Sequence, residues 1–202
     1  MNRSALYRGL FLLLLLLLSA CAATPPAPED HYYRLIVNDM PAANATVTIP
    51  GVLKIDAIKA YGIYRERALL YSEETHPEAL QQHRYHYWID TPTRLIRDQL
   101  VDFLRASHVA EQVAGAQVTL SGDLRLRLTL KQFERVVSDA GGAGVRVALD
   151  GVISSADGKP VKIVSYSREL PIKENSIAAS VTAFSQALNE IYFEVLKDLR
   201  SH

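Results

Sequence analysis

The stretch "QVTLSGDLRLRLTLKQFERVV", Gln117–Val137, decides the fold because apolar and polar residues alternate along its centre. Four leucines fall on one side of an extended chain: Leu124, Leu126, Leu128 and Leu130. The residues between them are polar: Arg125, Arg127, Thr129 and Lys131. This pattern is typical of a β-strand with one buried and one solvated face. A sheet built on it needs a second layer over its apolar face.

Two more strands are predicted directly after this one. A glycine-rich turn, Ser138 to Gly144, leads into "VRVALDGVISSADGKPVKIVSYSREL", Val145–Leu170. Asp157-Gly158 lies near the middle of that stretch, and Asp-Gly between apolar runs is a strong hairpin signal. The sequence therefore predicts a three-stranded antiparallel meander.

Two stretches have the spacing of amphipathic helices. Thr91 can cap the first helix, Pro92 suits its first position, and Ser107 and His108 end it. The second runs from Ser176 to Arg200. Its apolar stripe is Ile177, Val181, Phe184, Leu188, Ile191, Val195 and Leu199.

Further strands are expected ahead of the first helix. They are predicted at His31–Val37, within Ala45–Gly62 (one or two strands), at Ile63–Glu74 and at His83–Asp90. With the meander and the two helices, this order predicts an α+β fold. We expect two layers, with a largely antiparallel sheet and both helices packed on one of its faces.

The amino-terminal residues 1–20 are typical of an export signal. Arg3 and Arg8 precede an apolar run that is well short of the about 20 residues needed to span a bilayer. "LSAC", Leu18–Cys21, resembles the lipobox of bacterial lipoproteins, in which the cysteine is lipidated and cleavage falls just before it. Cys21, the only cysteine, is therefore the predicted lipidation site, and two or more acyl chains such as palmitate anchor stably. An ordinary secretory signal or an uncleaved anchor is the alternative.

Residues 21–30 form a predicted tether between the lipid and one domain at 31–202. Pro25, Pro26 and Pro28 favour an extended spacer. In enteric-type lipoproteins an Asp directly after the cysteine marks inner-membrane retention, and here Ala22 takes that place. This indicates an outer-membrane anchor, with the domain facing the periplasm.

Composition and motifs exclude several functions. The whole chain has 22 basic and 22 acidic residues, and loss of Arg3 and Arg8 leaves 20 against 22, near −2. Nucleic-acid binding normally leaves a basic footprint, so none is expected. His83 and His86 are expected on opposite faces of a strand, without further ligands, and no metal site is predicted. The glycines of 141–144 lead into a strand, unlike a phosphate loop.

No catalytic set stands out, so we predict a non-enzymatic protein without a cofactor. The region Tyr61–Trp88 is instead rich in aromatic residues, which are favoured at protein interfaces. Ordinary packing is the alternative explanation. Trp88, next to a helix cap, is expected to be structural. Tyr64 and Tyr71 flank charged residues and form the candidate partner surface.

Four segments together carry a family resemblance: "YYRL" (Tyr32–Leu35), "YGIYRERALLYS" (Tyr61–Ser72), "YWIDTPTRLIRDQLVDFL" (Tyr87–Leu104) and "AFSQALNEIYFEVLKDL" (Ala183–Leu199). With the lipobox, their order resembles that of the ABC-type transport auxiliary lipoproteins, the family that includes the paraquat-inducible protein C type. The resemblance covers most of the mature chain.

The resemblance implies a non-enzymatic component of an intermembrane lipid transport system, anchored in the outer membrane. Its expected partner is an MCE-domain protein and, through that protein, an inner-membrane ABC permease. The transported lipid and a homo-oligomeric state stay open. A scaffold or assembly lipoprotein of another outer-membrane complex is the alternative function, and a hydrolase is a distant third.

Overall fold

The computed structural model describes residues 28–43 and 46–201. The strands are β1 (His31–Tyr33), β2 (Ile49–Ile55), β3 (Lys59–Ala60), β4 (Ala68–Glu73), β5 (His76–Trp88), β6 (Ala110–Ala114), β7 (Leu124–Val137), β8 (Ala143–Ser155) and β9 (Pro160–Pro171). The helices are the short 3₁₀ helix η1 (Gly62–Arg65), α2 (Pro92–Ala106) and α3 (Ile177–Arg200). The export signal, Cys21 and the first prolines of the tether lie outside the described residues.

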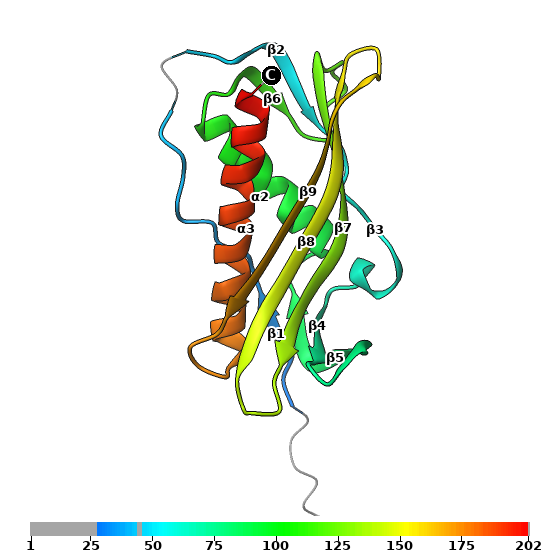
Figure 1. Cartoon of the computed structure of the whole chain (residues 1–202), viewed down its shortest axis with the longest axis vertical. Coiled ribbons are helices and arrows are strands. Elements are labelled where there is room, and N and C mark those ends of the chain that lie inside the picture. Colours follow the sequence, from blue (N-terminus) through cyan, green and yellow to red (C-terminus); the bar gives the residue numbers. More distant parts are fainter. Residues whose placement is uncertain (1–27, 44–45, 202) are drawn as a thin grey trace, which may run out of the picture.

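Strand β7 lies inside the sheet and pairs with β2, β3, β4 and β8 (Figure 1). Along one edge it pairs antiparallel with β8 over its whole length, from Leu124–Ser155 to Val137–Ala143. Along the other edge β2, β3 and β4 pair with it in turn, all parallel. The longest ladders are antiparallel, and with α2 and α3 they confirm the predicted α+β fold and the three-stranded meander.

The alternation along β7 changes phase half-way. Leu126, Leu128 and Leu130 are buried, as predicted. Between Leu130 and Gln132 the register with β8 shifts by one residue, which is a β-bulge. Beyond the bulge the odd-numbered residues face the helices, so Phe133 enters the core. Arg135, two residues on, is buried on the same side.

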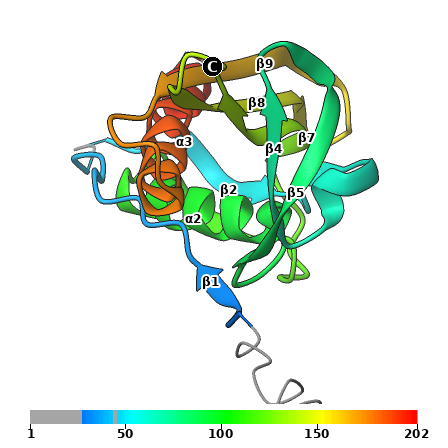
Figure 2. The ribbon, with the colours of Figure 1, turned by 90° about the horizontal axis from the view of Figure 1, so that it is seen from below.

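Both helices lie on one side of the curved sheet (Figure 2). Helix α3 begins as predicted, because the Ser176 hydroxyl accepts a hydrogen bond from the Ala179 amide at 3.1 Å. Thr91 holds the cap position of α2, but its side chain makes no capping bond. The two helices are joined by the Tyr192 hydroxyl, which donates to the Ile96 carbonyl at 2.8 Å.

Three aromatic rings join α3 to the sheet. The ring of Phe184 lies 4.4 Å from that of Phe133 and 5.4 Å from that of Trp88, centroid to centroid. All three side chains are at most 2% exposed, and Leu188 is fully buried one turn after Phe184. The predicted core positions on α3 are therefore confirmed from Phe184 onward, whereas Ile177 and Val181 are only partly buried, and the structural place of Trp88 is confirmed.

Several element boundaries differ from the prediction. The first strand ends at Tyr33 rather than at 37, and a 3₁₀ turn, η1, precedes β4. Strand β5 begins at His76, seven residues before the expected start. Strand β6 was not predicted, because five residues without clean alternation give no periodic signal. Among the described residues no helix has the length and apolarity of a membrane span.

Candidate functional site

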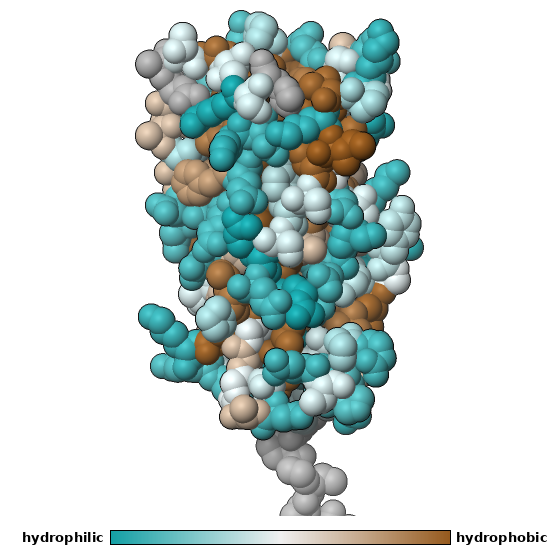
Figure 3. Space-filling view, in the orientation of Figure 1, coloured by the Kyte–Doolittle hydropathy of each residue, from teal (hydrophilic) through white to brown (hydrophobic). Residues whose placement is uncertain are grey.

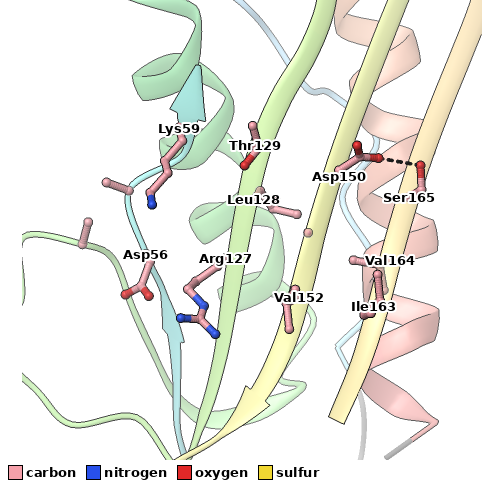
Figure 4. Close-up of a pocket in the computed structure, with 13 residues that line it drawn as sticks. Asp56, Lys59, Arg127, Leu128, Thr129, Asp150, Val152, Ile163, Val164 and Ser165 are labelled. Atoms are coloured by element: carbon pink, nitrogen blue, oxygen red, sulfur yellow. Dashed lines mark hydrogen bonds between the residues drawn. The ribbon is translucent and has the colours of Figure 1, made fainter. Parts of the chain in front are cut away.

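An open groove lies on the outer face of the sheet, the face away from the helices (Figure 4). Its volume is about 960 Å³, and it runs from β3 across β7 to β8 and β9. We call it the outer groove; its side-chain walls are Asp56, Lys59 and Arg127 on one side and Val152 and Ile163 on the other. Figure 3 shows apolar surface over the upper ends of β8 and β9 on an otherwise largely hydrophilic face.

The charges of the outer groove are unevenly paired. Asp56 lies 3.9 Å from Arg125 on β7, and Asp150 accepts a hydrogen bond from the Ser165 hydroxyl at 2.7 Å. Lys59 and Arg127 are exposed and have no hydrogen-bond or ion-pair partner within the described parts of the chain. Arg127 lies on the solvated face of β7, as the alternation of that strand predicts. That Arg127 lines the same groove as Lys59 and Ile163 depends on the order of the strands in the sheet, which the local sequence pattern does not reveal.

A second group of side chains surrounds β1, at the end of the fold where the tether enters. The His31 ring stacks on His86 at 5.2 Å, and the Tyr33 hydroxyl is 2.9 Å from Nδ1 of His86. The Tyr71 ring lies 4.4 Å from His83. These five residues form what we call the β1 cluster. It is a packed aromatic contact between β1, β4 and β5.

The expectation that His83 and His86 point to opposite faces is wrong, because their rings meet edge-on at 6.2 Å. Between them Tyr85 has a left-handed backbone, with φ of 63°. The register with β4 jumps there from Ala68–Tyr87 to Leu70–Gln82, so β5 bulges outward and its alternation is lost.

Two histidines of the β1 cluster, His83 and His86, have lowered pKa values. The pKa of His83 is lowered to about 4, mainly by burial and in smaller part by the nearby charges of Arg135 and His86. Burial also lowers the pKa of His86. Within the described ranges no three histidine, cysteine or acidic side chains are arranged to hold a metal ion.

The two candidate docking tyrosines lie on opposite faces of the sheet. The Tyr64 hydroxyl donates to Oε2 of the buried Glu134 at 2.5 Å, whereas Tyr71 pairs in register with Arg135. Successive strand residues point to opposite faces, so Glu134 and Arg135 mark the two sides. Tyr64 therefore lies on the outer face and Tyr71 on the helix side, and the structure does not bring them into one patch.

The surroundings of the two tyrosines also differ. Burial and the bond to Glu134 raise the pKa of Tyr64 well above its ordinary value. The Tyr71 hydroxyl makes an exposed hydrogen bond to Gln81 at 2.8 Å. Tyr71 is therefore the residue that a partner can reach at less structural cost.

Comparison with known proteins now decides the family. The family model described as "ABC-type transport auxiliary lipoprotein component" matches residues 33–195 of the sequence. The chain belongs to this family. No curated protein matches the chain.

The fold of this auxiliary lipoprotein is similar to that of solved structures. Protein XCC0632 from Xanthomonas campestris is 19% identical, with a TM-score of 0.73 over 82% of this chain and 92% of that one. An uncharacterized protein is 15% identical, with a TM-score of 0.67 over 85% and 99%. The hypothetical protein CT253 from Chlamydia trachomatis is 7% identical, with a TM-score of 0.52 over 76% and 99%. At these identities the likeness shows the fold alone.

Membership makes this chain an auxiliary lipoprotein component of an ABC-type transport system. A membrane-anchored location in the periplasm is consistent with membership of this lipoprotein family. The anchor itself, Cys21, lies outside the described residues, and its lipidation stays a prediction.

Proposed function

We propose that this lipoprotein is anchored in the outer membrane and docks the MCE-domain protein of an intermembrane lipid transport system. The observation that carries the proposal is the family match over 33–195, which covers most of the predicted domain. Through the MCE-domain protein the chain would serve an inner-membrane ABC permease. The role is non-enzymatic: the domain binds a partner, and the permease supplies the energy.

The predicted anchor and the fold together give the domain an orientation. The tether from Cys21 to Asp30 is ten residues long and rich in proline, and an extended spacer of that length reaches about 30 Å. It leads into β1 at one end of the elongated fold, while the β8–β9 hairpin lies at the opposite end (Figure 1). We propose that the β1 end faces the membrane and the hairpin end faces the periplasm.

The proposed docking residues are Tyr64 and Tyr71, each on its own face of the sheet. Interface energy usually concentrates in a few Trp, Tyr and Arg side chains, which supports tyrosines as anchors. Tyr71 is the stronger candidate, since its hydrogen bond is exposed and its ring is half-buried. Tyr64 also holds the buried Glu134, so part of its effect will be structural.

Crosslinking in living cells tests the proposal. The native lipoprotein is crosslinked at the cell envelope, isolated under denaturing conditions, and its partners are identified by mass spectrometry. We expect an MCE-domain protein among the crosslinked products. If the products come only from another outer-membrane complex, the scaffold function replaces this one.

A further inference from the structure

The outer groove presents two cations that nothing in the described fold neutralises. Lys59 on β3 and Arg127 on β7 are exposed, without a hydrogen-bond or ion-pair partner in the described residues. The carboxylate on the same wall, Asp56, is 3.9 Å from Arg125, a third cation. This wall therefore has an excess of positive charge, and a guanidinium beside an ammonium group suits a phosphate or carboxylate head.

The opposite wall of the outer groove carries an apolar pair beside the hydrogen-bonded Asp150 and Ser165. Val152 and Ile163 are partners in the β8–β9 ladder and share the outer face. Ile163 is 81% exposed, the largest exposed fraction among the large apolar side chains of the described chain. Exposed Ile163 and partly buried Val152, in one groove with the unpaired Lys59 and Arg127, form the arrangement that a molecule with one anionic and one apolar end would fill.

An extended peptide fits the outer groove less well than an alkyl chain. The strands of its floor are paired with one another, β7 with β8 and β8 with β9, in antiparallel ladders that each have one register shift. Among the described strands of the floor, only β9 has an edge without a strand partner. The floor therefore offers side chains but few free backbone groups. A peptide laid across it would leave its own amide groups without partners, whereas an alkyl chain needs none.

We infer that the outer groove binds an anionic amphiphile, with its head at Lys59 and Arg127 and its alkyl chain over Val152 and Ile163. A volume of about 960 Å³ lies at the upper end of the range of ligand sites. The inference goes beyond the proposed docking role, because docking requires no ligand site on this chain.

Calorimetric titration of the mature chain 21–202 tests the inference. The chain carries Cys21→Ser, so that no acyl group competes for the groove. The probes are dodecyl phosphate, the zwitterionic dodecylphosphocholine and inorganic phosphate, each below its micelle concentration where one exists. We expect dodecyl phosphate to bind at least about tenfold more tightly than either other probe.

Variants separate the head site from the tail site. Lys59→Gln with Arg127→Gln should weaken dodecyl phosphate binding at least about tenfold, and Ile163→Ser at least about threefold. Lys131→Gln and Val161→Ser are the matched controls, a cation on β7 and an exposed valine on β9 outside the groove lining. They should bind within about twofold of the parent chain. Ile163→Thr replaces Ile163→Ser if the serine variant fails to fold, as judged by circular dichroism.

Three results would each overturn the inference. They are no binding of dodecyl phosphate, equal binding of dodecylphosphocholine, and unchanged binding by the Lys59/Arg127 double variant. Inorganic phosphate binding as tightly as dodecyl phosphate would also overturn it, leaving an ion site only. None of these bears on the docking proposal, since capture of the MCE-domain protein is measured separately.

Discussion

Replacing Phe184 by alanine should remove the contact that holds α3 on the sheet. Its side chain is fully buried and meets both Phe133 and Trp88, so it joins the helix to β7 and β5. A buried Phe→Ala change costs about 3–5 kcal/mol, a figure that includes the lost aromatic pairs. For a domain of this size about 1 kcal/mol shifts the melting temperature by about 2–4 °C. We therefore expect Phe184→Ala to melt roughly 6–20 °C lower.

The matched control for this prediction is Phe193→Ala on the same helix. Phe193 is 40% exposed and touches Phe103 edge-on at 5.0 Å. Its truncation should cost less than about 1.5 kcal/mol, because little buried area is lost. Thermal unfolding of the mature chain carrying Cys21→Ser, followed by circular dichroism, measures both variants. The reasoning fails if Phe184→Ala melts within about 2 °C of the parent chain, or if Phe193→Ala loses as much.

Three further predictions concern the anchor, the β1 cluster and the docking tyrosines. Cys21→Ala should abolish metabolic labelling with a fatty acid and leave an uncleaved precursor; equal label on both proteins would show that Cys21 is not the lipid site. Because the folded pKa of His83 is lowered to about 4 from an unfolded value of about 6.5, its stabilisation is present above about pH 6.5 and is lost as the pH falls toward 4. After allowance for its partial exposure, the loss by pH 5 should be on the order of 1 kcal/mol, and His83→Gln should remove it; an equal pH dependence of unfolding in the variant contradicts the assignment. Tyr64→Phe should cost about 1–3 kcal/mol in urea unfolding by leaving buried Glu134 without its hydrogen-bond donor. Tyr71→Ala should cost about 1 kcal/mol by removing the ring contact with His83, and should weaken partner capture at a temperature at which the variant stays folded. A stable Tyr64→Phe or a fully capturing Tyr71→Ala counts against these roles.

The local sequence pattern predicts the meander and both helices, but it does not predict the β-bulge in β7. The leucine alternation predicts β7 correctly up to Leu130. It cannot show the bulge at Lys131, because Lys131 and Gln132 are both polar and either phase fits them. Yet that bulge sends Phe133 and Arg135 to the helix side. Arg135 is buried there, where its guanidinium donates to the Ser180 hydroxyl and to the Asn175 side chain.

The candidate sites show the same limit. Tyr85 takes a left-handed backbone that its residue type does not signal, and this brings His83 and His86 together. The parallel pairing of β2, β3 and β4 along one edge of β7 depends on contacts distant in sequence. It sets Lys59 beside Arg127 in the outer groove. The sequence predicts which residues are exposed or buried, but it does not predict which of them lie side by side in the folded sheet.

Binding of a purified MCE-domain protein from the same organism tests the central claim most directly. The lipoprotein is immobilised through its anchor in a nanodisc, so that the tether and the β1 end keep their place at a membrane. We predict saturable binding of the MCE-domain protein, weakened by Tyr71→Ala at a temperature at which the variant stays folded. No binding by the native lipoprotein under these conditions would contradict the account.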